Sequence, residues 1–479
     1  MLNFSIGKSS PNHKTMSRVV EQRNVRPKQG IEAQGIERVL PTARSHVRIL
    51  DNFTLWLAAN TVLSTIVLGA LAINVFGLGV WDSIGVIVVF NLLGVSSVAF
   101  FATLGPKLGL RQMTIARFSF GWVGASVMAM FNVITCLGWS VVNVIVGGQL
   151  VQALSGGIVP SWLGILGITA LTTSVSLYGY RYVHRYGRYA WMPMGLIFLA
   201  IAVINVPQAT IVTAKSSGLA YVASLLSFSG VIYGAAAGWG PYAADYSAKQ
   251  PETTPSSKVF GLTFLGIWIP CVLLESLGVL LTTVPALNGK SGGELVAAAL
   301  NPLGSLGTVM MLLLALSVVA NNIPNDYSLA LSIQVLGGVF QRIKRWIWTL
   351  AGSVVYAVIA ISASRNFDQT LETFLLLIAY WLGPWAIILV SEHCFRRGQY
   401  NVEDWNNPDR LPSGWAAIVA MALGLFGVYL GVAQVAFVGP IAGLFNPPYG
   451  MDIGFGLGVL FAAITYLVLR PIERRSTQR

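Results

Sequence analysis

The stretch Gly-Ala-Ala-Ala-Gly-Trp-Gly-Pro at residues 234–241 interrupts an apolar run that extends over residues 219–242. Three glycines and one proline within these eight residues disfavour a regular α-helix. Inside a bilayer, irregular backbone occurs only where protein buries it or where it lines a water-filled cavity. The stretch therefore predicts a discontinuous membrane helix with Trp239 at the break. Glycine-rich segments also serve simply for close helix packing, and the sequence leaves that alternative open.

The composition of the whole chain is that of a membrane protein. The sequence has 479 residues, of which 55% are hydrophobic and 10% are charged, and its mean hydropathy is +0.68. Soluble domains contain about 25% charged residues, so an ordinary soluble enzyme is excluded. The three cysteines have no spacing typical of a disulfide framework or a metal site.

Apolar segments that approach or exceed the ~20 residues needed to cross the hydrocarbon core occur repeatedly. Twelve of them predict an all-α polytopic membrane protein with twelve transmembrane helices. They cover residues 53–76, 82–103, 124–154, 159–179, 188–207, 219–242, 260–283, 306–335, 347–363, 371–392, 414–437 and 450–469.

The basic residues are distributed asymmetrically about these segments. With the N-terminus inside the cell, 27 of the 30 Lys and Arg residues lie in cytoplasmic segments, and only Lys215, Lys290 and Arg365 lie outside. This pattern follows the positive-inside rule and predicts that both termini are cytoplasmic. The net charge of +12 therefore indicates orientation in a membrane rather than binding to nucleic acid.

Polar ends flank one predicted transporter domain. Residues 1–50 contain no apolar stretch typical of a signal peptide, and we expect them to form a mobile cytoplasmic tail. Residues 51–470 are predicted to form the transmembrane domain, and residues 471–479 a second cytoplasmic tail.

Uncharged polar side chains in the third and eighth segments are candidates for ligand binding. Trp139 and Asn143 are four residues apart and so lie on one face of a helix. In the eighth segment, Asn321, Asn322 and Asn325 surround a mid-span proline. A structural alternative exists for each, because tryptophan anchors helices at the membrane interface and asparagine bonds to neighbouring helices. For Asn322 and Asn325 the structural role is the favoured interpretation.

Ionisable side chains within membrane segments are rare and usually functional. Glu275 lies in the seventh segment and Asp326 in the eighth, where each is either a proton carrier or a structural partner. The sequence contains no evident nucleophile–base set, metal-ligand cluster, phosphate-binding loop, arginine ladder or potassium-channel filter. The chain is therefore expected to be neither an enzyme nor a channel, and no cofactor or metal is predicted.

Two indoles and several amides suit a particular kind of ligand. Indoles stack on flat rings, and an amide presents both a donor and an acceptor to the edge of a heterocycle. No fixed charge is evident at the centre of the membrane region. A neutral, flat heterocycle therefore fits better than a charged amino acid.

Six stretches of the chain form a recognisable set. They are Gly-Ile-Glu-Arg at 35–38, Trp-Leu-Ala-Ala-Asn-Thr-Val-Leu-Ser at 56–64, Ala-Thr-Leu-Gly-Pro-Lys-Leu-Gly-Leu-Arg-Gln-Met at 102–113, Gly-Trp-Ser-Val-Val-Asn at 138–143, Gly-Trp-Gly-Pro-Tyr-Ala-Ala-Asp-Tyr at 238–246 and Ala-Asn-Asn-Ile-Pro-Asn at 320–325. Together they resemble the nucleobase:cation symporter-1 family, in its purine–cytosine permease branch. The resemblance implies a LeuT-type fold, in which helices 1–5 and 6–10 are inverted repeats and helices 11 and 12 are peripheral. It also implies breaks in helices 1 and 6; helix 1 contains no proline, so its break follows from the resemblance alone.

The resemblance also implies which groups bind the substrate. Two indoles would enclose a base, two amides would bond its edge, and one backbone group and one hydroxyl would complete the lining: Trp139 and Trp239, Asn143 and Asn321, Gly238, and Ser64. The hydantoin branch of the family has a glutamine at the position of Asn143. The asparagine here therefore favours the purine–cytosine branch.

The coupling cation is expected to be a proton, with sodium as the alternative. Sodium-coupled relatives bind the ion with carbonyls of helix 1 and a Ser/Thr pair before the asparagine of helix 8. The corresponding residues here are Ala315 and Leu316, although Ser317 is adjacent. A hard cation prefers oxygen ligands, so the missing hydroxyls favour a proton carried by Glu275 or Asp326.

The predicted function is secondary active symport. The chain would import cytosine and/or purine bases with a cation across the plasma membrane by alternating access. The alternatives on the same fold are transport of allantoin, uracil, a thiamine-like vitamin or an amino acid; a membrane enzyme or a sensor is disfavoured. The expected partners are the nucleobase and the lipid bilayer, with no nucleic acid and no obligate protein partner.

Overall fold

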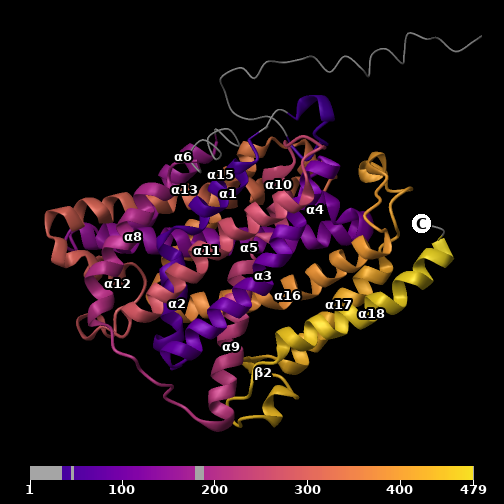
Figure 1. Cartoon of the computed structure of the whole chain (residues 1–479). Coiled ribbons are helices and arrows are strands. Elements are labelled where there is room, and N and C mark those ends of the chain that lie inside the picture. The colour runs from indigo at the N-terminus through magenta and orange to yellow at the C-terminus, as the bar shows by residue number, and fades with distance from the viewer. Residues whose placement is uncertain (1–34, 45–47, 178–187, 478–479) are drawn as a thin grey trace, which may run out of the picture.

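The computed structural model describes residues 35–44, 48–177 and 188–477. The predicted N-terminal tail lies outside the described residues up to residue 34 and at residues 45–47. Helices form most of the described chain (Figure 1). An antiparallel hairpin of two short strands, β1 (Ala433–Gln434) and β2 (Phe437–Val438), connects the last two long helices.

The α-helices follow the predicted apolar segments, with a few short helices between them. Their bounds are α1 Leu50–Asn60, α2 Leu63–Asn74, α3 Val80–Leu108, α4 Gln112–Ile115, α5 Arg117–Leu154, α6 Ser161–Ser176, α8 Trp191–Asn205, α9 Gly218–Ala237, α10 Ala243–Ser247, α11 Ser256–Leu281, α12 Gly292–Leu300, α13 Ser305–Val335, α14 Gly338–Arg342, α15 Arg345–Ala363, α16 Phe367–Phe395, α17 Trp415–Gly431 and α18 Gly454–Thr477.

The helices have the length and apolarity of a multi-pass membrane protein. Across the described residues, eight helical stretches are long and apolar enough to cross a membrane, and the bent pair α1 and α2 makes a ninth. One of the eight, Arg345–Phe395, contains both α15 and α16, while the apolar helices α6 and α17 are shorter. The all-α membrane architecture is thus confirmed, and the count of twelve spans stays a prediction.

The first apolar segment is broken near its middle. α1 ends at Asn60 and α2 begins at Leu63, and the helix axes differ by 53°. Thr61 (φ −85°, ψ 66°) and Val62 (φ −139°, ψ 163°) leave helical geometry. The Thr65 hydroxyl donates to the Asn60 carbonyl (2.8 Å), which the break would otherwise leave without a helical partner. The interruption that the resemblance implied for this helix is therefore present.

The glycine-rich stretch interrupts the sixth segment more gently. α9 ends at Ala237, and the chain passes through a 3-10 turn at Gly240–Tyr242 into α10. The whole of Gly218–Ser247 still continues as one span, without the sharp bend between α1 and α2. The predicted irregularity at Trp239 is confirmed as a change of helical pitch.

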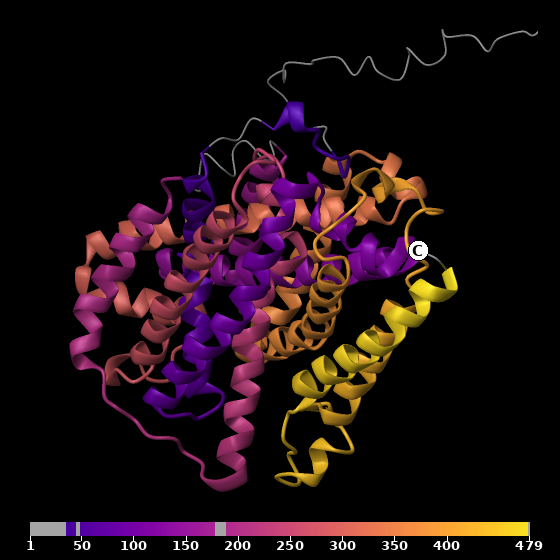
Figure 2. The same cartoon turned by 45° about the vertical axis from the view of Figure 1, so that its right-hand side comes forward.

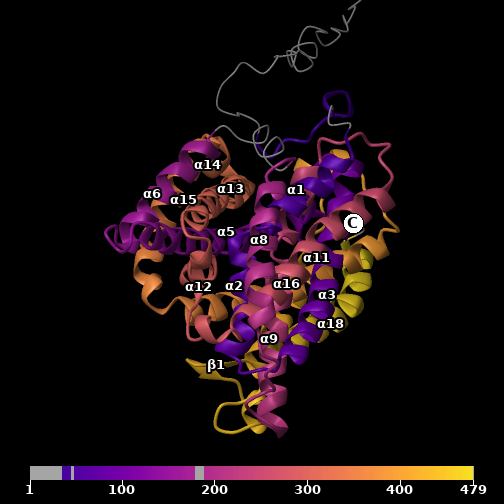
Figure 3. The same ribbon diagram turned by 60° about the vertical axis from the view of Figure 1, so that its left-hand side comes forward.

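The helices pack as two groups that face each other. α5, α6, α13 and α15 contact one another, whereas α1, α2, α3 and α11 form a second group that α9 and α10 join through α3. Figure 3 shows the first group on one side of the bundle and the second on the other. Gly69 allows α2 to contact α11 directly, because a Cβ there would lie 1.8 Å from the Glu275 carbonyl oxygen.

The last two long helices lie along one side of the molecule. α17 and α18 pack against each other and against α16 (Figure 2). Arg470 of α18 donates through Nε (2.8 Å) and Nη2 (2.7 Å) to the two oxygens of Glu392 on α16. Arg470 Nη1 also donates to Glu473 (2.9 Å). The buried pair of Arg470 with Glu392 thus connects α18 to α16, at the side of the two facing groups.

Candidate functional site

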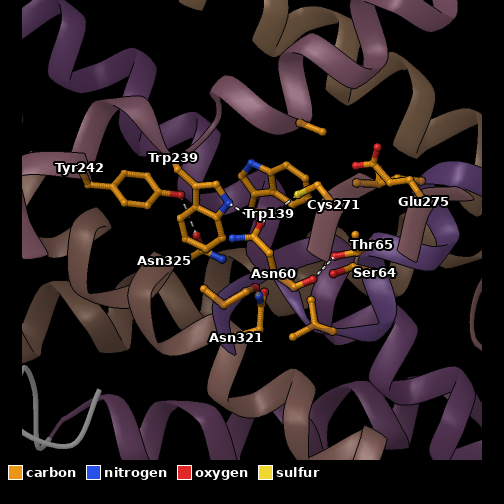
Figure 4. A pocket seen from close by; sticks show the side chains of 14 residues that line it. Asn60, Ser64, Thr65, Trp139, Trp239, Tyr242, Cys271, Glu275, Asn321 and Asn325 are labelled. Atoms are coloured by element: carbon orange, nitrogen blue, oxygen red, sulfur yellow. Dashed lines mark hydrogen bonds between the residues drawn. The ribbon is translucent and has the colours of Figure 1, made fainter. Parts of the chain in front are cut away.

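A pocket lies where the two interrupted helices meet α5, α11 and α13 (Figure 4). Its cavity volume is about 30 Å³, which holds about two waters at the ~10–15 Å³ that each requires. Ligand pockets usually measure ~300–1,000 Å³, so the lining side chains must separate to admit a heterocycle. The lining residues are Ala59, Asn60, Val62, Ser64, Thr65, Leu68, Trp139, Ala235, Trp239, Tyr242, Cys271, Glu275, Asn321 and Asn325.

Trp239 extends into the pocket from the interruption between α9 and α10. Its indole Nε1 donates to Asn60 Oδ1 (3.0 Å). Trp56 and Tyr242 contact its ring nearly at right angles, with centroid distances of 5.4 and 5.5 Å and interplanar angles of 74° and 78°. These edge contacts fix the plane of the indole, and neither neighbour is a parallel stacking partner.

Trp139 of α5 lines the same pocket and lies against the second interruption. Its ring meets Phe374 of α16 edge to face (5.7 Å, 82°). A Cβ added at Gly238 would lie 3.0 Å from Trp139 Nε1, so the glycine gives the indole room to approach the backbone of α9. Gly238 thus adjoins the pocket through Trp139, although its own atoms do not line the cavity.

The predicted amides form a hydrogen-bonded chain that ends at the first interruption. Asn143 Nδ2 donates to Asn321 Oδ1 (2.8 Å), and Asn321 Nδ2 donates to the Ala59 carbonyl (2.5 Å). Asn321 lines the pocket, whereas Asn143 lies behind it. The Asn321 amide retains one N–H and one lone pair that a ligand can use, and Asn143 acts on such a ligand through Asn321.

A second amide of α13 faces the pocket one helical turn further on. Asn325 Oδ1 accepts a hydrogen bond from the Tyr242 hydroxyl (3.1 Å), and its Nδ2 donates to Asn322 Oδ1 (3.2 Å). Asn322 is fully buried and does not line the cavity. The structure therefore gives a lining position to Asn325, for which the sequence favoured a structural role, and an internal position to Asn322.

Besides Asn325, four lining polar side chains were not named as candidates from the sequence. They are Asn60, Thr65, Tyr242 and Cys271. Two signals were available, because Asn60 lies in the recognised stretch at 56–64 and Tyr242 directly follows the Gly-Pro of the opening stretch. Ser64, which was predicted, lines the pocket from the first turn of α2.

Glu275 brings a carboxyl group to the pocket from α11. The side chain is 1% exposed, and its Oε2 accepts a hydrogen bond from Asn91 Nδ2 of α3 (2.6 Å). The bond comes from a neutral amide rather than from a basic side chain. A buried carboxyl group beside a ligand cavity is suited to exchange a proton there.

The other two coupling candidates lie away from the pocket. Asp326 Oδ2 accepts a hydrogen bond from the Ser176 hydroxyl of α6 (2.9 Å), and Ser317 donates to the Leu314 carbonyl within α13 (2.7 Å). Neither residue lines the cavity. Among the described residues, no group of three or more His, Cys, Asp or Glu side chains is arranged to hold a metal ion.

Known proteins are similar to this chain in both sequence and fold. The family described as permeases for cytosine/purines, uracil, thiamine and allantoin matches residues 39–446. The purine-cytosine permease fcyB of Emericella nidulans is 40% identical over 92% of this chain and 89% of its own length. The purine-cytosine permease FCY2 of Saccharomyces cerevisiae is 39% identical, over 92% of this chain and 86% of its own length.

A solved structure agrees with the arrangement of the helices. Mhp1, a nucleobase-cation-symport-1 family transporter in a closed conformation with bromovinylhydantoin bound, superposes with a TM-score of 0.72. The alignment covers 93% of this chain and 96% of Mhp1 at 16% sequence identity. At this identity the likeness shows a shared fold.

Proposed function

The chain belongs to the permease family for cytosine/purines, uracil, thiamine and allantoin, that is, the nucleobase:cation symporter-1 family, and on this premise we propose that it imports cytosine and purine bases together with a proton. It is a membrane transporter and not an enzyme. The observation that carries the proposal is the joint lining of one pocket by Trp139, Trp239 and Asn321.

The chemistry of this lining suits a nucleobase. Two indole rings offer stacking surfaces to a flat heterocycle. The amides of Asn321 and Asn325 offer both donors and acceptors to its edge. The relatives fcyB and FCY2, which are named purine-cytosine permeases, support cytosine and purines over the other compounds handled in the family.

The two facing helix groups provide a route for alternating access. The pocket lies between them, with α5 and α13 on one side and the two interrupted helices on the other. Rocking of one group against the other would open the pocket to each side of the membrane in turn. We propose that the protein lies in the plasma membrane with twelve spans, ten of them in a five-plus-five inverted repeat. The distribution of basic residues favours both termini in the cytoplasm.

A proton is favoured over sodium because Ala315 and Leu316 offer no side-chain oxygen to the ion, and because two carbonyls at the first interruption already accept hydrogen bonds from side chains. Ala59 O accepts from Asn321 Nδ2 and Asn60 O accepts from the Thr65 hydroxyl. We assign the proton to Glu275, which lines the pocket. The neutral form of a buried carboxyl group costs less to enclose than its ionised form, so protonation would ease closure of the pocket.

Uptake measurements test the proposal. Radiolabelled cytosine and adenine are supplied to a host that lacks its own base uptake, with unlabelled uracil, allantoin, thiamine and amino acids as competitors. We expect uptake of both bases and competition by neither thiamine nor amino acids. Failure to take up cytosine and adenine, or full activity of Trp239→Ala, would refute the assignment.

The proton assignment has a separate test. Glu275→Gln is expected to exchange labelled for unlabelled base but to lose accumulation that a protonophore abolishes in the unchanged protein. Asp326→Asn, which lies away from the pocket, is the matched control and should keep protonophore-sensitive accumulation. Uptake that requires sodium and ignores the protonophore would instead establish sodium coupling.

A further inference from the structure

Asn60 forms hydrogen bonds with several residues at the pocket, more than a residue that only contacts a ligand would need. It is the last residue of α1 and is 5% exposed. Its Oδ1 accepts hydrogen bonds from Trp239 Nε1 (3.0 Å) and from the Cys271 thiol (3.5 Å). Its Nδ2 donates to the Trp56 carbonyl one turn earlier in α1 (2.9 Å). Figure 4 shows the amide between the indole of Trp239 and α2.

These partners determine the orientation of the amide. An indole N–H is only a donor and a backbone carbonyl is only an acceptor. The oxygen of Asn60 must therefore face Trp239 and its nitrogen must face Trp56, since the reverse orientation would place donor against donor and acceptor against acceptor. The side chain is held at both ends, so it presents a fixed acceptor to Trp239.

The bond to Asn60 also restricts what Trp239 can offer a base. The indole has a single N–H, and Asn60 occupies it. Trp239 is thus left to act through its ring face, and the direction of that face depends on the N–H bond together with the edge contacts of Trp56 and Tyr242. Base–aromatic stacking weakens when the planes are misaligned.

We infer that Asn60 is a positioning residue that sets the stacking plane of Trp239 for the base. This inference rests on the proposed function, because it assumes that a nucleobase stacks in the pocket. Asn60 connects the two interrupted helices through its bond to Trp239, which lies 179 residues further along the sequence. Its effect should reach the base through Trp239 and should therefore vanish when the indole N–H is removed.

A double-mutant cycle tests this dependence. Uptake kinetics of adenine and cytosine are measured for Asn60→Ala, Trp239→Phe and the double variant, with Vmax corrected for the amount of transporter in the membrane. Loss of one neutral hydrogen bond predicts a KM increase of about two- to tenfold in each single variant, with Vmax retained. The increase should be larger for adenine, whose two rings stack over a larger area. Adding Asn60→Ala to Trp239→Phe should change KM less than about twofold, because the donor is already gone.

The controls separate positioning from a general loss of structure. Asn205→Ala removes another buried asparagine, on α8, that also donates to the carbonyl one turn earlier (2.9 Å to Ile201); it should leave both KM values unchanged. If Asn60→Ala does not reach the membrane, Asn60→Ser takes its place in the same cycle, because it also removes the amide acceptor of Trp239 Nε1. Additive effects of Asn60→Ala and Trp239→Phe would overturn the inference. If the unchanged protein takes up neither base, the proposed function fails instead.

Discussion

The two interruptions that border the pocket have opposite sequence signatures and opposite geometry. Residues 234–241 contain three glycines and a proline, yet Gly218–Ser247 continues as one span. Residues 61 and 62 are threonine and valine, yet α1 and α2 differ in direction by 53°. Glycine and proline content therefore located one interruption but did not predict how strongly either helix bends.

The hydrogen bonds at each site explain the difference. At the first interruption, side chains from outside α1 donate to the freed carbonyls: Asn321 of α13 to Ala59 O, and Thr65 of α2 to Asn60 O. At the second, the bonds are local, as when Gly238 N donates to Gly234 O (3.0 Å). A sharp bend in a membrane helix needs such donors, or water in a cavity, to replace the lost helical bonds.

The glycines of the second interruption serve close packing. None of Gly234, Gly238 and Gly240 has a positive φ. A Cβ at Gly234 would lie 2.3 Å from the Leu375 carbonyl oxygen, whereas one at Gly240 would lie 3.5 Å from the nearest atom of Trp385. The packing role that the sequence left as an alternative is therefore present, together with the change of pitch at Trp239.

The largest loss of stability is expected from Gly234→Ala. The new methyl group would meet backbone of α16 at 2.3 Å, and backbone cannot rotate away as a side chain can. Overpacking typically costs ~1–3 kcal/mol, occasionally more, so we expect a lowered Tm and a loss of most uptake. Gly240→Ala, with only ordinary contacts, is the matched control and should keep a near-normal Tm. Equal Tm values for the two variants would contradict the packing role.

Asn321→Ala should have the next largest effect, at the first interruption. It removes the donor to Ala59 O and the acceptor for Asn143 at once. A buried group left without its partner costs ~1–3 kcal/mol, and the proposed contact to the base is also lost. Uptake should fall below detection while the protein still reaches the membrane, as measured by membrane quantification and thermal unfolding. Retained uptake would remove Asn321 from the site.

Thr65→Val tests the donors from outside α1, and because Thr65 also lines the pocket, stability rather than uptake is the measurement. The substitution keeps the branched shape of the side chain but removes the hydroxyl that donates to Asn60 O. We expect a loss of ~0.5–1.5 kcal/mol of stability, seen as a lower Tm. Thr65→Ser, which keeps the hydroxyl, is the control and should recover most of the loss. If valine and serine behave alike, the hydroxyl does not stabilise the bend.

The same contrast explains what could be predicted from the sequence. Trp239 was identified from its place at a helix break, Trp139 from the helix face that it shares with Asn143, and both from the family resemblance; the structure brings both to one pocket. Asn60 was not identified, because its role depends on a bend that the residue types at 61 and 62 do not predict. Glu275 and Asp326 could not be separated either, since the rotation of each helix decides that one lines the pocket and the other bonds to Ser176.

Thr61→Val should have the smallest effect, because the carbonyl that accepts from its hydroxyl keeps a second donor. The Thr61 hydroxyl donates to the Leu57 carbonyl (2.6 Å), but Thr61 N donates to the same carbonyl (2.9 Å). Removal of the hydroxyl therefore leaves Leu57 O with a partner, unlike removal of the Thr65 hydroxyl at Asn60 O. The cost should lie at the lower end of the ~0.5–1.5 kcal/mol range, so that Tm falls less than in Thr65→Val and the KM for adenine stays unchanged. A larger destabilisation from Thr61→Val than from Thr65→Val would mean that bonds within α1, and not donors from outside it, hold the first interruption in its bent form.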